Sequence, residues 1–183
     1  MVGNAEGMME HVVIVDPQGR RIGTEEKIRA HAGGGTLHLA FCVLVFNPRG
    51  ELLLQRRADS KYHFAGLWSN SCCGHPRPEE GVVEAAERRL GEEFGFSTRL
   101  QPVARFTYHA EDPRSGLAEH EYAHVLIGRA QDEQPAPDPD EIGAWAWAAP
   151  TGLRAGTEEE RHRYTPWFRR LMREQPVDEW ATR

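Results

Sequence analysis

The chain has 183 residues, of which 39% are hydrophobic and 27% are charged, and its formal net charge is −6. This length and composition are typical of one globular domain and exclude a disordered chain. The acidic balance also excludes non-specific nucleic-acid binding, which requires a clustered basic surface. An anionic substrate would therefore need a few local Lys or Arg side chains and metal ions to bind.

The sequence shows neither a membrane span nor a secretory signal. No apolar run approaches the roughly 20 residues that a membrane-spanning helix needs, and residues 1–10 are expected to be a loose tail. The cysteines are Cys42, Cys72 and Cys73, and an odd number with an adjacent pair makes a poor disulfide framework. We therefore expect reduced thiols, a cytoplasmic location, no membrane or nucleic-acid partner, and a monomer or weak dimer.

The first half of the chain has the patterns of strands. His11–Val15 is a β-rich run, and Leu37–Phe46 is an almost unbroken apolar stretch that suits a strand buried on both faces. Between them, His31–Gly35 is expected to be a loop with three successive glycines. Asn47–Gly50 then predicts a turn into a second strand, Glu51–Gln55, which makes a hairpin.

Pro78–Phe94 has the clearest helical period, with an apolar stripe along one face and Gly95 at the position that follows a helix. Gly91 lies inside this helix, where glycine costs about 1 kcal/mol relative to alanine, so we expect close packing to require it. Later strands are expected around Val103–Tyr108, Glu121–Gly128 and Trp145–Ala148.

The end of the chain has helix-start signals. Gln131–Glu141 is acidic and Pro-rich, which is typical of a solvated loop. Thr157 and Glu160 have the spacing of a capping box. Thr165 and Pro166 then suit the N-cap and first residue of a final helix. Together these patterns predict that residues 1–183 form a single α+β (mixed α/β) domain.

The segment from Gly74 to Phe96 carries the most specific pattern, G-x5-E-x7-R-R-L-x-E-E-x-G-F. It resembles the Nudix box, a loop–helix–loop that holds divalent metal on a diphosphate. The spacing over 23 residues makes this interpretation stronger than the alternative of an amphipathic helix with a charged solvent face. Arg89 and Glu93 are four residues apart, so they share one helical face. The resemblance implies a Nudix-like fold, with mixed β-sheets sandwiched by helices, and Glu93 as a ligand of diphosphate-bound Mg²⁺.

One position departs from the hydrolases of this superfamily. In Nudix hydrolases the residue after the box arginine is normally a glutamate that helps to bind the catalytic metals, whereas this chain has Arg89. A guanidinium removes one metal ligand and supplies a bidentate phosphate donor. The box therefore favours holding a diphosphate over hydrolysing it.

Beyond the box, the chain resembles type I isopentenyl-diphosphate isomerases from His11 to about Trp167. The resemblance is carried by the segments E-K-I-R-A-H, L-H-L-A-F, N-S-C-C-G-H-P and E-H-E, which come in the family's order and at close to its spacing. By themselves, the histidines could be core or surface residues, although His and Glu also suit a divalent metal. The resemblance implies a second divalent metal, Mn²⁺, Zn²⁺ or Mg²⁺, and no flavin. Its implied ligands are His31, His38, His75, Glu119 and Glu121.

The resemblance also implies the reacting groups. The residues alone do not say which of Cys72 and Cys73 faces the site, and most free cysteines are small buried hydrophobes. The family places its catalytic thiol immediately before Gly-His, which implies Cys73. Glu121 is then the second proton-transfer group, and Tyr108 assists it. The order of protonation and deprotonation stays open, because the reaction is reversible.

The implied activity interconverts isopentenyl and dimethylallyl diphosphate by metal-assisted antarafacial proton transfer. Trp68 is a candidate wall of the site, and Arg56 is the alternative to Arg57 as a phosphate donor. Two other functions remain: a Nudix diphosphate hydrolase, and a catalytically silent diphosphate-binding module. The implied substrate-binding residues are Lys27, Arg57, Lys61, Arg89 and Trp167.

Overall fold

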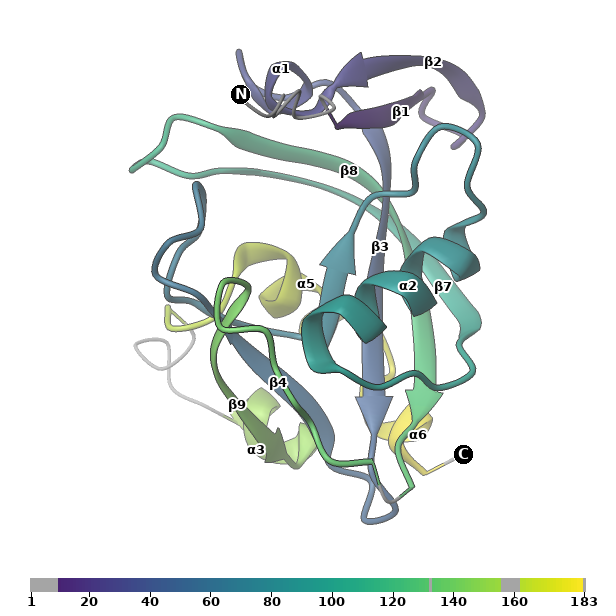
Figure 1. The fold of residues 1–183 in the computed structure, drawn as a ribbon, viewed down its shortest axis with the longest axis vertical. Coiled ribbons are helices and arrows are strands. Elements are labelled where there is room, and N and C mark those ends of the chain that lie inside the picture. Colours follow the sequence, from purple (N-terminus) through teal and green to yellow (C-terminus); the bar gives the residue numbers. More distant parts are fainter. Residues whose placement is uncertain (1–9, 132, 156–161, 183) are drawn as a thin grey trace, which may run out of the picture.

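The computed structural model describes residues 10–131, 133–155 and 162–182. Apart from Glu10, the expected N-terminal tail lies outside them, as does the expected capping box of Thr157 and Glu160. The elements are β1 (His11–Val15), β2 (Arg21–Glu26), α1 (Lys27–His31), β3 (His38–Phe46), β4 (Leu52–Arg57), β5 (Trp68–Ser69), β6 (Cys72–Gly74), α2 (Val82–Phe94), β7 (Gln101–Glu111), β8 (Ala118–Arg129), β9 (Ile142–Ala148), α3 (Pro150–Ala155), α5 (Pro166–Glu174) and α6 (Val177–Ala181) (Figure 1).

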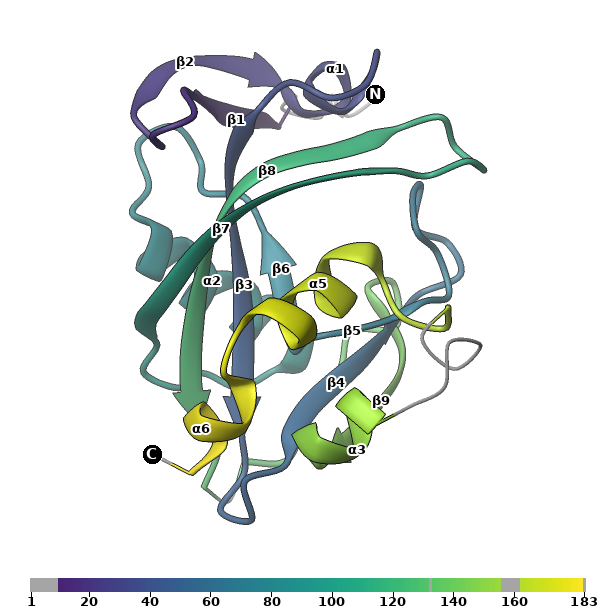
Figure 2. The ribbon, with the colours of Figure 1, turned by 180° about the vertical axis from the view of Figure 1, so that it is seen from behind.

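Within the described residues, nine strands join into one mixed, curled sheet around β3. β3 pairs in parallel with β8 and antiparallel with β1, β4 and β6, and β4 continues the sheet to β5 and β9. Helix α2 covers one face, and α5 covers the other (Figures 1 and 2). The expected α+β fold, with strands between helices, is confirmed.

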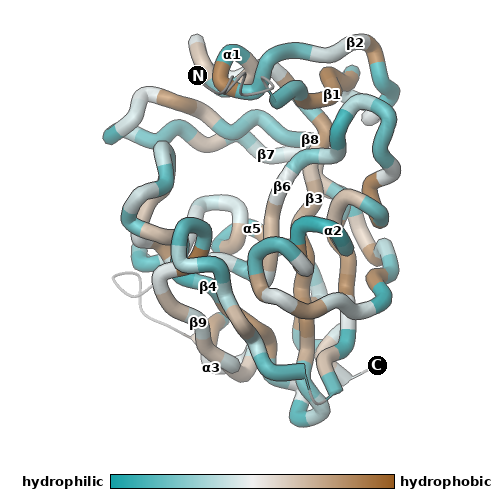
Figure 3. Tube along the Cα trace, in the orientation of Figure 1, coloured by the Kyte–Doolittle hydropathy of each residue, from teal (hydrophilic) through white to brown (hydrophobic). Residues whose placement is uncertain are grey.

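Every residue of β3 is buried, as its apolar run predicts. Successive side chains point to opposite faces of the strand. Phe41, Val43 and Val45 accordingly pack in the α2-side cluster, whereas Cys42 and Leu44 pack in the α5-side cluster. The strand is the continuous hydrophobic band in the middle of Figure 3. A strand buried on both faces thus separates two cores.

The predicted hairpin after β3 forms, but its strands separate at once. Only Phe46 and Leu52 are paired between β3 and β4. β4 then pairs with β9, while β3 pairs with β8 along its whole length. This divergence opens space between β4 and β6 where the site lies.

Helix α2 begins at Val82, four residues later than predicted, and ends as expected at Phe94, followed by Gly95 with φ 72°. The expected packing reason for Gly91 is wrong. A Cβ there would meet only the Phe96 carbonyl oxygen, at an ordinary distance of 3.9 Å. Gly91 is therefore a local cost in helix propensity that packing does not require.

Helix α5 has Thr165 at its N-cap and Pro166 at its first position, as predicted. The Thr165 hydroxyl does not cap the helix, however, because it lies 3.0 Å from the Ser69 hydroxyl. Ser69 also accepts a 2.9 Å hydrogen bond from Trp167 Nε1. These bonds fix the first turn of α5 against β5. None of the described helices combines the length and apolar character needed to cross a membrane.

Candidate active site

A pocket of about 130 Å³ opens between β4, β6, β8 and the C-terminal half of α2. All the predicted site residues line it except His31 and His38, which are fully buried behind it. Trp68, expected as a candidate wall, does not line it and packs in the α5-side core instead. The lining residues are Glu10, Lys27, Gln55, Arg57, Lys61, Tyr62, His63, Ser69, Cys73, Gly74, His75, Arg89, Glu93, Tyr108, Glu119, Glu121, Glu141 and Trp167.

The five predicted metal ligands come together from four parts of the chain. β8 presents Glu119 and Glu121 on one face, and its register with β3 places Glu121 beside His38. His31 is the last residue of α1, and His75 follows β6. Their ligand atoms all lie within 4.8 Å of one another. An all-nitrogen-and-oxygen donor set of this kind suits Mn²⁺, Zn²⁺ or Mg²⁺.

Two observations test whether this cluster fits a metal. His31 Nε2 and Glu119 Oε2 lie 3.0 Å apart, yet neither makes a hydrogen bond of acceptable geometry, and both are buried. His31 Nδ1 lies 2.6 Å from the Lys27 carbonyl, and His38 Nδ1 lies 2.7 Å from the Thr36 carbonyl. These carbonyls orient each ring so that Nε2 points into the cluster, as in metal-binding histidines. The residues therefore fit a divalent metal.

The electrostatics of the cluster favour neutral imidazoles at His38 and His75 and one strongly ionised carboxylate. Burial and the charge of His31 lower the pKa of His38 to about 4. Burial and the charge of His38 lower the pKa of His75 well below its usual value. Burial also opposes the charged form of His31, but Glu119 raises the pKa of His31 above its usual value. Burial opposes ionisation of Glu119, but the close contacts and charge of His31 and His63 hold its pKa well below normal. Neutral histidines can bind a metal without first losing a proton.

The pKa of Glu121 is shifted in the opposite direction to that of Glu119. Burial and the charge of Glu119 raise its pKa well above the usual value. The Tyr108 hydroxyl donates to Oε2 at 2.5 Å, while Oε1 lies 2.9 Å from His75 Nε2. A raised pKa makes this carboxyl group better able to hold a proton, as a group that donates and accepts protons in catalysis must.

The structure distinguishes the adjacent cysteines. Cys72 is fully buried and packs in the α2-side core, whereas Cys73 is half-buried and lines the pocket. The amide of Asn70 donates to Cys73 Sγ at 3.1 Å, and Cys42 Sγ lies 3.7 Å from it on the neighbouring strand. Alternation along β6 therefore turns Cys73 toward the site and Cys72 away from it.

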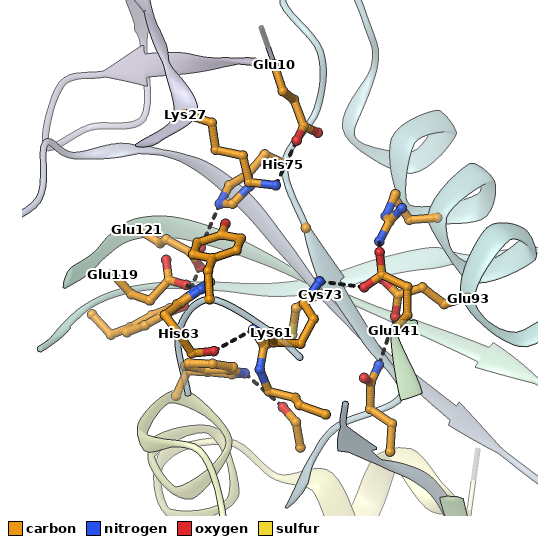
Figure 4. Close-up of a pocket in the computed structure, with 18 residues that line it drawn as sticks. Glu10, Lys27, Lys61, His63, Cys73, His75, Glu93, Glu119, Glu121 and Glu141 are labelled. Carbon is orange, nitrogen blue, oxygen red and sulfur yellow. Dashed lines mark hydrogen bonds and ion pairs between the residues drawn. The ribbon is translucent and has the colours of Figure 1, made fainter. Parts of the chain in front are cut away.

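A second acidic group lies across the pocket from Glu119 and Glu121, with Cys73 between them (Figure 4). It consists of Glu93 on α2 and Glu141 before β9. Arg89 Nη2 lies 2.6 Å from Glu93 and 3.2 Å from Glu141. Lys61 contacts Glu141 at 2.5 Å. Two cations and two carboxylates thus neutralise one another where a diphosphate and Mg²⁺ are expected.

The remaining predicted cations also lie at the pocket. Lys27 forms a 2.8 Å ion pair with Glu10. Arg57 lies with its guanidinium carbon 5.7 Å from the centre of the Trp167 ring. Arg56, the alternative, binds Asp59 outside the lining residues. The structure therefore places Arg57, and not Arg56, at the site.

Several residues at the site were missed from the sequence. His63 and Asn70 contact predicted residues, and Gln55 donates to Glu93 Oε2 at 2.9 Å. Glu141 lies at the end of the segment expected to be a solvated loop. Neither His63 nor Glu141 shares a local pattern with the residues it contacts, so only the non-local contacts identify them.

The comparisons with known proteins agree on fold and family. A NUDIX domain family model matches residues 36–168. The crystal structure of DR0079 from Deinococcus radiodurans is similar, with a TM-score of 0.68 at 21% identity, covering 90% of this chain and 98% of that chain. A MutT protein from Methanosarcina mazei has a TM-score of 0.63 at 18% identity, covering 80% and 96%. These two similarities show the fold.

Proteins with higher sequence identity show the family. An isopentenyl-diphosphate Delta-isomerase from Halorhodospira halophila is 80% identical over 95% of this chain and 99% of its own length. One from Serratia proteamaculans is 44% identical, over 95% of this chain and 97% of its own length. With its NUDIX domain and this identity along nearly the whole chain, the protein belongs to the isopentenyl-diphosphate Delta-isomerase family.

Proposed function

We propose that this protein interconverts isopentenyl diphosphate and dimethylallyl diphosphate, with Cys73 and Glu121 as the two proton-transfer groups. The observation that carries the proposal is their placement. Both line one pocket, with the His/Glu cluster at Glu121 and the cationic group of Lys61 and Arg89 on the other side. A diphosphate held by the cations would place a short alkene between the thiol and the carboxylate.

An unactivated alkene is a weak base, so its protonation to a tertiary carbocation is costly. The enzyme must place an acid at one carbon and a base at its neighbour, and must exclude water that would trap the cation. Cys73 and Glu121 supply these groups, and their roles exchange with the direction of the reaction. Tyr108 holds Glu121 through its hydroxyl. The indole of Trp167 stabilises the cation, a contact that can reach about 2 kcal/mol when desolvated.

The diphosphate does not react and serves to position the alkene. Its binding energy comes from Lys27, Arg57, Lys61 and Arg89, and Mg²⁺ on Glu93 would neutralise its remaining charge. The second metal would be held by the three histidines with Glu119 and Glu121, where it supplies charge that favours the ionised carboxylate. Because Cys73 acts as a thiol, we propose that the protein works in a reducing cytoplasm.

The test is incubation of the protein with isopentenyl diphosphate, Mg²⁺ and Mn²⁺ in D₂O, followed by NMR. We expect dimethylallyl diphosphate and deuterium uptake into both isomers, without phosphate release. Cys73→Ala should abolish both signals, because it removes a proton-transfer group. Cys72→Ala is the matched control and should keep them, since Cys72 faces the core. Phosphate release without isomerisation would instead identify a hydrolase, and activity of Cys73→Ala would reject the proposed thiol.

A further inference from the structure

His63 is a fourth histidine at the cluster, and the proposed reaction gives it no role. It is 6% exposed and lies between β4 and β5. Its Nε2 contacts Glu119 Oε1. The other oxygen, Oε2, faces His31 and has no hydrogen bond. His63 therefore holds the oxygen of Glu119 that does not face His31.

His63 contacts a ligand of the cluster but is not part of it. The five groups whose donor atoms lie within 4.8 Å of one another do not include it. Its second ring nitrogen, Nδ1, is buried and has no hydrogen bond to any residue that the structure describes. Among these residues the ring therefore has one polar contact, the one with Glu119, and this contact fixes how the carboxylate is rotated. Groups that orient a metal ligand in this way tune the affinity for the metal.

The backbone of His63 is held from the diphosphate side of the pocket. Arg57 Nη2 donates to its carbonyl at 3.0 Å, and Lys61 lies two residues before it. Phe64 follows with φ 48°, the one positive value among the non-glycine residues that the structure describes. Such a conformation persists where the surroundings over-determine it. Here the Phe64 amide donates to Asp112 Oδ2 at 2.9 Å, and its ring packs edge-on against Trp167 at 5.2 Å.

We propose that His63 is a positioning residue that couples the His/Glu metal cluster to the diphosphate-binding segment Arg57–His63. This inference rests on the proposed function, because it assumes a metal at one site and a diphosphate at the other. A diphosphate bound by Arg57 and Lys61 orders the segment and holds His63 against Glu119, in the orientation the metal needs. By linkage, the metal then strengthens diphosphate binding by the same factor.

The experiment measures binding without any isomerisation. Two samples are prepared, metal-free protein and protein loaded with Zn²⁺ from which excess metal is removed. Each is titrated with inorganic pyrophosphate by calorimetry without added Mg²⁺, so that the cluster of the metal-free sample stays empty. We expect Zn²⁺ to strengthen pyrophosphate binding at least about 5-fold, which is the lower range of typical coupling. His63→Ala should abolish this difference and weaken Zn²⁺ binding by about 10- to 100-fold.

Two variants separate positioning from folding. His63→Gln keeps a donor near Glu119 and should restore part of the coupling; it also carries the test if His63→Ala fails to fold. His124→Gln, on β8 and outside the pocket, is the matched control and should bind like the unaltered protein. X-ray absorption of the Zn²⁺ forms should show the same number of nitrogen ligands with and without His63.

Three results would overturn the inference. The first is unchanged coupling in folded His63→Ala and His63→Gln. The second is equal pyrophosphate affinity with and without Zn²⁺ in the unaltered protein. The third is loss of a nitrogen ligand in His63→Ala, which would make His63 a metal ligand. None of these results depends on turnover. Failure of the deuterium assay would therefore reject the proposed reaction, whereas the coupling between Zn²⁺ and pyrophosphate binding would still be tested by calorimetry.

Discussion

The Tyr108 hydroxyl donates a 2.5 Å hydrogen bond to Oε2 of Glu121, the carboxylate oxygen opposite the one that faces His75. The carboxylate is thereby shared between a neutral donor on β7 and the histidine cluster. The register of β7 and β8 produces this contact, because Tyr108 and Glu121 are directly paired residues. A single strand pairing thus sets the orientation of Glu121, the proposed proton-transfer group.

Tyr108→Phe tests this contact. We expect kcat to fall about 10- to 100-fold, because a hydrogen bond to a charged group contributes roughly 1.5–3 kcal/mol. KM should stay nearly constant, since the hydroxyl contacts none of the cations at the diphosphate side. Steady-state isomerisation and metal analysis provide the measurement. Tyr122→Phe, also in the β-sheet but outside the pocket, is the control. An unchanged kcat would remove Tyr108 from the mechanism.

Glu141→Gln tests the ion pairs at the diphosphate side. Glu141 pairs with Lys61 and Arg89 in the structure, so its removal should free Lys61, leave Arg89 paired with Glu93 alone at this pocket, and lower KM for the substrate. We expect a decrease of about 2- to 5-fold, because partly exposed ion pairs contribute roughly 0.2–1 kcal/mol each. Glu51→Gln, which leaves the pocket untouched, is the control. A higher KM would show instead that Glu141 helps to bind Mg²⁺.

Removal of metal should destabilise the protein. Without a cation, the buried carboxylates of Glu119 and Glu121 repel one another, as the raised pKa of Glu121, caused by burial and by Glu119, indicates. Adding Mn²⁺ or Zn²⁺ at about 100 times Kd should contribute roughly 2.7 kcal/mol and raise Tm by about 5–10 °C above the chelator-treated protein. Differential scanning calorimetry measures this. Glu119→Gln should gain much less, and an equal gain would place the metal elsewhere.

Asp112 should make stability depend on pH. It is buried and accepts hydrogen bonds from the amides of Phe64 and Arg114 and from the Ser115 hydroxyl. Burial opposes ionisation, but these bonds lower the pKa of Asp112 below its usual value. A carboxyl whose pKa is lower in the folded protein stabilises it above the unfolded pKa of about 3.9, and this contribution is lost as the pH falls through the folded pKa.

Asp112→Asn should therefore lower the free energy of unfolding by about 1–3 kcal/mol at neutral pH, and the difference should shrink below about pH 4. Urea unfolding of both proteins across this range measures it. The exposed Asp59→Asn is the control and should change stability by less than about 0.5 kcal/mol. A difference that grows toward low pH would have the wrong sign.

Gly91→Ala should stabilise the protein, because a Cβ there meets no neighbour closer than 3.9 Å. We expect a gain of about 0.5–1 kcal/mol and a rise in Tm of about 1–4 °C. Gly128→Ala is the contrasting control. Its Cβ would lie 2.7 Å from side-chain atoms of Thr98 and Leu100, so the variant should be less stable. A lower Tm for Gly91→Ala would restore a packing role for this glycine.

The sequence predicted those parts of the fold that local periodicity specifies. The apolar run of β3 and the helical stripe of α2 need no partner to be recognised, because burial follows the period of each element. Short helices carry no such period. The sequence therefore predicts a loop from His31 to Gly35 and no helix before it, whereas Lys27–His31 form α1, which the Glu26 side chain caps.

The sequence by itself determined the set of candidate site residues, through a family resemblance whose spacing runs along nearly the whole chain. Only the tertiary structure decided how they face one another. Cys72 and Cys73 must point to opposite faces of a strand, but which face meets the pocket depends on β6 pairing with β3 beneath α2. His63 and Glu119 are 56 positions apart, and their contact exists because the folded chain brings the β4–β5 segment against β8. Local side-chain patterns specify elements, whereas long-range packing specifies the site.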